Sequence, residues 1–193
     1  MDKLGSRPTI SKQRKEILAD VQEEILEIGF GTGLNLAYYP SRIKKITVVD
    51  NNPVMKKKAR RRLQTSPIAV EFLITAGESL PMKNNSFNSV VSTFTLCSIQ
   101  NVNQALNEIK RVLRPGGRFF FLEHGLSNEE AIIKWQNYLN PFQKFFGDGC
   151  NLNRDILGLI QQAGFKIDKT QKFYLEKELK THGFMYKGVA IKR

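Results

Sequence analysis

With 193 residues, 41% of them hydrophobic, the chain is long enough to bury the core of one domain and leaves little room for a second. Thirty Lys and Arg against 18 Asp and Glu give a net charge of +12, which favours anionic partners such as nucleic acid, acidic membranes or anionic substrates. Its two cysteines, Cys97 and Cys150, are too few for a disulfide framework and lack zinc-site spacing, so we expect a cytoplasmic protein without metal. The first ten residues lack the apolar stretch of a signal peptide, and the charge-free run 84–107 is too polar to span a membrane.

Patterns in the first half of the chain alternate between helix and strand. The run 45–50 contains Ile, Thr, Val and Val in succession, a β-branched composition typical of a buried strand. In chain order we predict a helix at 11–20, a strand at 24–28, a helix at 34–38, a strand at 45–50, a basic helix at 53–63, and strands at 70–74 and 88–94.

The second half continues the alternation. Val102, Leu106 and Ile109 recur at helical spacing, and the helix that they indicate ends at the turn 114–117. We then predict a strand at 118–123, an aromatic helix at 128–146, a helix that Asn153 caps and that runs to 163, and strands at 165–175 and 184–192. The alternation predicts an α/β fold with a doubly wound, mostly parallel sheet, in which ligands bind beyond the carboxyl ends of the strands.

A glycine-rich loop follows the first predicted strand. Gly29, Gly31 and Gly33 allow a sharp turn and let a ligand touch the backbone, although a plain structural turn fits the same glycines. Leu34 stands where the dinucleotide fingerprint has glycine or alanine. The carboxylate of Glu27 would repel a pyrophosphate but suits an amino group or a sulfonium cation. S-adenosylmethionine has both cations and no phosphate, so the loop favours this ligand.

An acid follows the second predicted strand, 17 residues after Gly33. At this place Asp50, with Asn51 beside it, is suited to accept hydrogen bonds from ribose hydroxyls. Alone, Asp50 fits equally well as the cap of the next helix. Because loop and acid stand one strand apart, we favour the interpretation as a ligand site.

Several segments, in order, resemble the motifs of class I S-adenosylmethionine-dependent methyltransferases, above all the branch of the quinone-biosynthesis C-methyltransferases. These segments are 27–33, 49–50, 77–81, 87–91 and 111–117, and the resemblance covers residues 22–192. It implies a seven-stranded sheet with an antiparallel last strand and S-adenosylmethionine as cofactor. Further candidates for cofactor binding are Gly77 and Glu78 of the third motif and Thr93 at the end of the fourth strand. Ala76 replaces a frequent acid, so backbone groups or Glu78 would hold the adenine.

Other segments are similar to the methyltransferase-like seven family, the thiol methyltransferases of animals. They are 38–40, 76–78, 95–98, 123–124 and 147–152. The similarity implies a thiol or sulfide sulfur as the methyl acceptor. The sequence lacks the hydrophobic N-terminal anchor of that family, so membrane residence is not carried over. A quinol, phenol or lipid acceptor, or a non-catalytic cofactor-binding regulator, are the alternatives.

The residues at the end of the fourth predicted strand, 93–96, lack the acidic or amide residue and the paired prolines of base-amino methyltransferases. This argues against nucleic acid and favours a small-molecule acceptor. Candidate acid–base residues are Asp148 and His124, although Asp148 also fits a turn and His124 a structural role. Some of four aromatic residues of the predicted helix 128–146 are expected to line an apolar pocket, with core packing as the alternative: Trp135, Tyr138, Phe142 and Phe145.

We expect residues 1–193 to form a single methyltransferase domain. Its expected parts are an N-terminal helical lead-in at 1–21, a cofactor-binding core at 22–125, an acceptor-side lid at 126–152, and a closing helix and hairpin at 153–193. Within the core, Lys56 to Arg62 place six cations in seven residues. This run is either a solvated helix face or a docking patch for anionic membrane or RNA.

Overall fold

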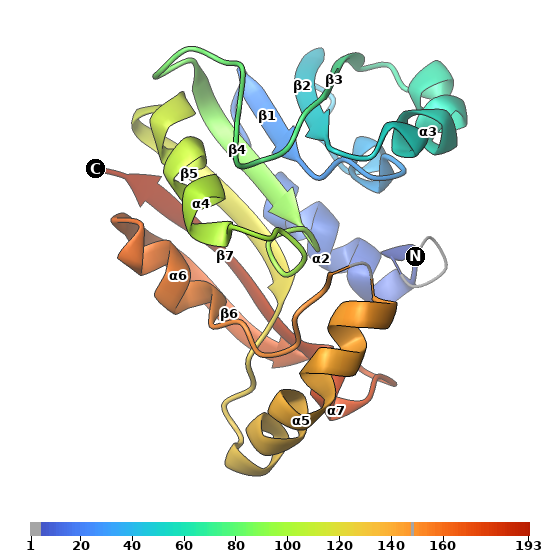
Figure 1. Cartoon of the computed structure of the whole chain (residues 1–193). Helices are drawn as coiled ribbons and strands as arrows, with labels where there is room; N and C mark the ends of the chain where they lie inside the picture. The colour runs from blue at the N-terminus through green and yellow to red at the C-terminus, as the bar shows by residue number, and fades with distance from the viewer. Residues whose placement is uncertain (1–4, 148) are drawn as a thin grey trace.

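Seven strands form one sheet in the computed structural model, which describes residues 5–147 and 149–193. They are β1 (Ile25–Ile28), β2 (Lys45–Asp50), β3 (Ala69–Ile74), β4 (Phe87–Thr93), β5 (Leu113–His124), β6 (Phe165–Tyr174) and β7 (Phe184–Lys192). Their order is β3-β2-β1-β4-β5-β7-β6, and all neighbouring pairs are parallel except the two that β7 makes. The predicted mostly parallel sheet with an antiparallel last strand is confirmed (Figure 1).

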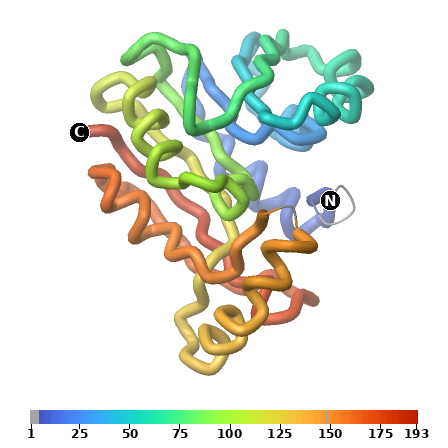
Figure 2. Tube along the Cα trace, viewed as in Figure 1, coloured from blue at the N-terminus to red at the C-terminus, as the bar shows by residue number. Residues whose placement is uncertain are grey.

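Helices cover both faces of this sheet. They are α2 (Pro8–Leu18), the 3-10 helix η1 (Leu34–Ala37), α3 (Pro53–Thr65), α4 (Val102–Val112), α5 (Glu130–Phe146), α6 (Ile156–Gln162) and α7 (Lys180–Gly183). Side chains of α4 and α6 share one hydrophobic cluster, and side chains of α2 and α3 share another. Figures 1 and 2 show α4 and α6 side by side on one face. Among the described residues, no helix is long and apolar enough to cross a membrane.

The middle of β5 shows how the sequence fills both cores. Phe119, Phe120, Phe121 and Leu122 are all fully buried. Successive side chains of a strand point to opposite faces, so Phe119 and Phe121 join the cluster of α4 and α6, while Phe120 and Leu122 join the other. A run of four apolar residues is what a strand covered on both faces requires.

Two predicted boundaries are wrong. Asp155, not Asn153, caps α6, because its carboxylate accepts the Gly158 N–H, whereas the Asn153 amide bonds to Asn137. The segment 114–117 belongs to β5: Leu113 already pairs with Phe87, and the extra residues form an irregularity before Arg118 pairs with Ser89.

One edge of the sheet collects the loops that matter for function. β1, β4 and β5 are parallel, so their carboxyl ends at Ile28, Thr93 and His124 lie on the same edge. β7 runs the other way and starts at this edge, where Met185 pairs with His124. In Figure 2 the blue N-terminal segment and the orange chain after α5 approach each other here.

Candidate active site

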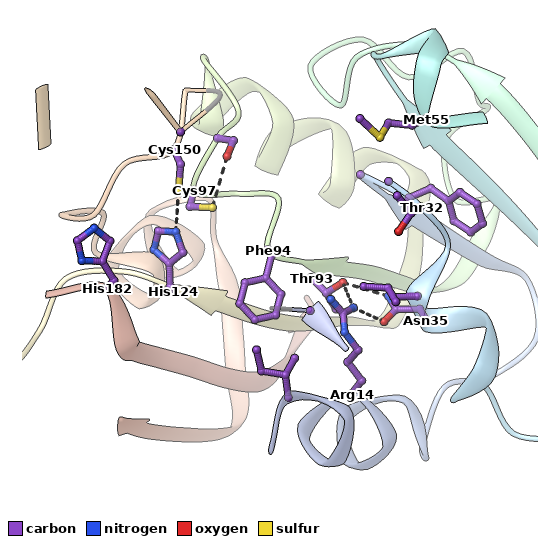
Figure 3. Close-up of a pocket in the computed structure, with 18 of the residues that line it drawn as sticks. Arg14, Thr32, Asn35, Met55, Thr93, Phe94, Cys97, His124, Cys150 and His182 are labelled. Carbon is purple, nitrogen blue, oxygen red and sulfur yellow. Dashed lines mark hydrogen bonds between the residues drawn. The ribbon is translucent and has the colours of Figure 1, made fainter. Parts of the chain in front are cut away.

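A cavity of about 470 Å³ lies at this edge of the sheet. That volume is within the range of small-molecule sites. Figure 3 shows two ends, one around Arg14, Asn35 and Thr93 and the other around Cys97, His124 and Cys150. Of the residues predicted from the sequence, the cavity brings together Glu27, Gly29, Gly31, Thr93 and His124.

The three glycines of the loop after β1 have positive φ angles of 71°, 56° and 77°, which glycine adopts most readily. A Cβ atom on Gly29 would lie 2.1 Å from Thr95 Oγ1, and one on Gly33 would lie 2.9 Å from the Phe30 ring. These two glycines therefore permit close packing inside the loop. A Cβ on Gly31 would meet no atom closer than 4.0 Å, so the backbone of Gly31 borders open space in the cavity.

Asp50 braces the glycine loop. Its Oδ2 accepts the Gly31 N–H at 2.7 Å and its Oδ1 accepts the Asn52 N–H at 2.9 Å. The cap of α3 is Asn52, whose side chain accepts the Val54 N–H, so the helix-cap interpretation of Asp50 is wrong. Asp50 is mostly buried and Asn51 is exposed, and neither is among the residues that line the cavity.

Glu27 is a buried carboxylate at the floor of the cavity, with 1% of its surface exposed. Its Oε2 accepts the Tyr39 hydroxyl at 2.7 Å and its Oε1 accepts the Asn35 amide at 2.9 Å. Burial raises the pKa of Glu27 to about 7, even though both hydrogen bonds and the nearby Arg14 oppose the shift. A cation bound beside Glu27 would favour its ionised form.

Arg14 of α2 is a residue of the site that sequence reasoning missed. Its Nη1 donates to Asn35 Oδ1 at 2.5 Å and to Thr93 Oγ1 at 2.8 Å, and its guanidinium lies over the Phe94 ring. Its Nε is buried and finds no partner among the described residues. A signal was present, because Arg14 interrupts the apolar stripe of Ile10, Ile17 and Leu18 on the buried face of the helix.

Two thiols and an imidazole form the other end of the cavity. His124 Nε2 lies 2.6 Å from Cys150 Sγ, and Cys97 Sγ lies 3.6 Å from Ser98 Oγ. A hydrogen bond with Cys97 and burial together raise the pKa of the Cys150 thiol well above its usual range. Both cysteines are buried, and both also line the cavity. His182, the second histidine of the chain, lines this end as well.

Other predicted residues stand apart from the cavity. Gly77 is packed against Ile28 and Ile99, and Glu78 accepts the Asn101 N–H at 3.3 Å. Asp148 lies outside the described residues.

The prediction that the aromatic residues of α5 line a pocket is wrong. Trp135, Tyr138, Phe142 and Phe145 are between 58% and 81% exposed, and none lines the cavity. The helix is held instead by Gln136, its one buried side chain in the described structure, which bonds to the backbone of Ser127, Gly125 and Thr181. With Gln136 turned inward, the helix turns its aromatic residues outward, and only Gln143 and Phe146 at its end reach the cavity.

The basic run on α3 is mostly exposed, and Ala59 is the one side chain of this helix that the structure buries. Two of the cations have contacts within the fold: Arg62 donates to the Thr32 carbonyl, and the Lys56 ammonium lies 5.6 Å from the centre of the Phe72 ring. Arg62 thus supports the glycine loop.

Comparisons with known proteins place this chain in a family. A sequence profile described as a methyltransferase domain matches residues 26–121. The human thiol S-methyltransferase TMT1A is 33% identical over 178 residues, which cover 84% of this chain and 71% of that protein. The rat thiol S-methyltransferase TMT1B is 37% identical over 145 residues, which cover 73% of this chain and 59% of that protein.

The fold agrees with these relatives. A solved structure of geranyl diphosphate methyltransferase in complex with S-adenosylmethionine has a TM-score of 0.71 and covers 95% of this chain and 85% of its own, at 13% identity. The predicted class and its cofactor, S-adenosylmethionine, are thereby confirmed. The chain belongs to the class I S-adenosylmethionine-dependent methyltransferases.

Proposed function

We propose that this enzyme transfers a methyl group to the sulfur of a small thiol or of sulfide. The observation that carries the proposal is a cavity that joins the glycine loop to an end lined by two thiols and an imidazole. The two relatives above, both named thiol S-methyltransferases, support the acceptor class. The chain spans 59% of the second relative, so the activity of the whole relative is carried over as part of this proposal.

The glycine-loop end fits S-adenosylmethionine, which supplies a methyl group already activated on a sulfonium sulfur. The Glu27 carboxylate is suited to pair with its ammonium group. Arg14, whose Nε lacks a partner in the described structure, is suited to pair with its carboxylate. The open space over Gly31 lets the backbone contact the ligand, and Asp50 holds that backbone in place and retains acceptor capacity for ribose hydroxyls.

The other end is suited to position the acceptor. Because the methyl group is activated, the protein mainly has to hold a nucleophile in line with it and keep water out. Phe94, Phe146 and Leu152 add apolar walls to the cavity, which suit a small apolar thiol. A free thiol ionises near ~8.5, so only a few per cent is reactive thiolate at neutral pH. The protein therefore gains by stabilising the thiolate.

Two residues were predicted to take the acceptor proton. His124 lines the cavity, but its Nε2 is engaged with Cys150 Sγ, so it acts as a free base only when that contact opens. Asp148 stays a prediction from the sequence. Its neighbour Gly147 lines the cavity, as does Cys150 two residues later.

A transfer assay with a tritiated methyl group tests the proposal. The acceptors are a small neutral thiol, sulfide, a quinol and a phospholipid, each at the same concentration. We expect label in the products of the thiol and of sulfide, and a rate that rises as the pH approaches the pKa of the acceptor thiol. Labelling of the quinol or the phospholipid alone would show that the acceptor class is wrong and would leave the methyltransferase assignment intact.

A further inference from the structure

Three segments far apart in the sequence bring soft metal-ligand atoms to one point. They are the loop after β4, which carries Cys97, the end of β5, which carries His124, and the loop after α5, which carries Cys150. The two sulfur atoms and an imidazole nitrogen all lie within 4.8 Å of one another. The chain has two cysteines and two histidines in total, so three of these four residues meet here.

Hydrogen bonds fix the cysteine-bearing loops relative to each other. The backbone N–H and the side-chain amide of Asn151 both donate to the Cys97 carbonyl at 2.9 Å. The Arg154 guanidinium donates to the carbonyls of Leu96 and Ile99 on either side of Cys97. The buried Glu123 carboxylate accepts the Thr95 N–H and holds the start of the same loop beside β5. These contacts fix the backbone that carries Cys97 relative to the segments that carry Cys150 and His124.

We propose that Cys97, His124 and Cys150 form a binding site for a zinc-like divalent ion, with an open fourth position that takes the sulfur of the acceptor thiol. Two thiolates and one imidazole are ligands that zinc prefers, and three protein ligands with one open position are typical of catalytic zinc. All three residues line the cavity, so the open position faces the space in which the acceptor is held. The metal site stands on this geometry alone, whereas its role toward the acceptor rests on the proposed function.

The chemistry balances without any redox step. The Cys97 and Cys150 thiols lose their protons to solvent when the ion binds, and the acceptor thiol loses its own when it takes the fourth position, because a metal-coordinated thiol is deprotonated. The coordinated sulfur then forms a bond to the methyl carbon, and the bond from that carbon to the sulfonium sulfur breaks with its electron pair left on the sulfonium sulfur. The products are a methyl thioether of the acceptor, which is a weak ligand and leaves the ion, and the demethylated cofactor. In this arrangement His124 positions the ion rather than acting as a base.

Cobalt(II) titration of the protein tests the site without reference to activity. The protein is kept reduced with a phosphine, because a thiol reductant would compete for the ion. We expect one equivalent of cobalt to produce the near-ultraviolet charge-transfer bands of cobalt–thiolate bonds, and zinc to abolish them. Then 2-mercaptoethanol should raise the charge-transfer intensity by about half, since it adds a third thiolate to two.

Variants assign the ligands. C97S and C150S should each lower the band intensity per bound cobalt by about half, and H124N should weaken cobalt binding by about tenfold or more. H182N is the matched control, because His182 lines the same cavity but is outside the cluster, and it should bind cobalt as the unmodified protein does. Circular dichroism of each variant shows whether it has folded.

The outcomes separate this inference from the proposed function. Absence of cobalt–thiolate bands in folded, reduced protein would overturn the metal site. The metal site would also be overturned if the two cysteines form a stable disulfide in the presence of zinc. If protein stripped with a chelator methylates thiols at the full rate, the role toward the acceptor is overturned and the proposed function stands. If cobalt and 2-mercaptoethanol bind as expected but no thiol is methylated, the proposed function fails and the metal site stands.

Discussion

We predict that the buried carboxylate of Glu27 makes cofactor binding sensitive to pH, since we propose that it pairs with the ammonium group of the cofactor. With its pKa at about 7, Glu27 is largely protonated in the free protein below neutral pH, whereas a bound ammonium group requires it to be ionised. At pH 5.5, about 1.5 units below this pKa, only about 3% of Glu27 is ionised, so we expect cofactor affinity to be about 30-fold, or about 2 kcal/mol, weaker than the plateau value. The E27Q variant should lose this dependence and bind with the weaker affinity throughout.

Ionisation of Glu27 favours cofactor binding but lowers the stability of the folded protein without cofactor. The pKa of Glu27 is raised from 4.5 to about 7 on folding, so the protonated form is favoured in the folded protein. Its contribution is therefore fully present below pH 4.5 and is lost as the pH rises through 7, by about 3 kcal/mol in total. We expect E27Q to be more stable to denaturant than the unmodified protein at pH 8 and to differ little from it at pH 4.5, when no cofactor is bound.

Isothermal calorimetry with the demethylated cofactor measures its affinity and the number of protons released on binding. That ligand keeps the ammonium group, and pH 5.5 to 7 avoids the titration of its own amino group near 7.7–8.0. Buffers of different ionisation enthalpy should report about 0.9 protons released on binding at pH 6, and E27Q should release almost none. The other cavity-lining side chains that carry ionisable groups, among them His124, His182, Cys97 and Cys150, keep their identity in E27Q. An affinity that is flat over this range, or equally steep in E27Q, would refute the pairing of Glu27 with the ammonium.

Three further predictions concern the glycine loop and its surroundings. Gly31→Val should abolish cofactor binding in calorimetry, because the valine side chain would enter the cavity. Gly116→Val is the control and should bind normally, since Gly116 has a similarly positive φ of 75° and open space around it. Binding by both variants would contradict the placement of the ligand. Asp50→Ala should weaken binding by about 1–3 kcal/mol, because the Gly31 amide loses its acceptor, and an unchanged Kd would show that this brace is dispensable. In a third variant, Gln replaces four exposed cations of α3, namely Lys57, Lys58, Arg60 and Arg61, while Arg62 is kept as a support of the loop. Turnover of a small thiol in the tritium assay should be unchanged, and a large loss would exclude the interpretation of this run as a merely solvated face.

Much of the fold followed from local patterns in the sequence. The β-branched run of β2 and the helical spacing in α4 matched the structure within a residue. β2 lies between two other strands of the sheet and is mostly buried, and α4 packs against the sheet through periodic apolar positions. The orientation of α5 did not follow. Its aromatic residues outnumber its other apolar residues, so the apolar pattern predicts that the aromatic face is buried. In the structure the hydrogen bonds of Gln136 hold the opposite face of the helix against the protein.

The part of the candidate site that is formed by a local sequence motif could be predicted from the sequence. The glycines and Asp50 stand at fixed places relative to two strands, and the structure joins Asp50 to Gly31 by a hydrogen bond. Arg14 and the Cys97–His124–Cys150 cluster depend on contacts between residues up to 79 positions apart, and no local spacing reveals such contacts. Arg14 was detectable only as a charge within an apolar stripe.

Identification of the reaction product tests the central claim most directly. We would incubate the protein near pH 8 with 2-mercaptoethanol and S-adenosylmethionine that carries a deuterated methyl group. The products are then separated and their masses are measured by mass spectrometry. We predict a methyl thioether that carries the three deuterium atoms, formed in equal amount to the demethylated cofactor, and none with Gly31→Val. Formation of the demethylated cofactor with a methylated quinol or lipid, and no thioether from any thiol or from sulfide, would contradict the account.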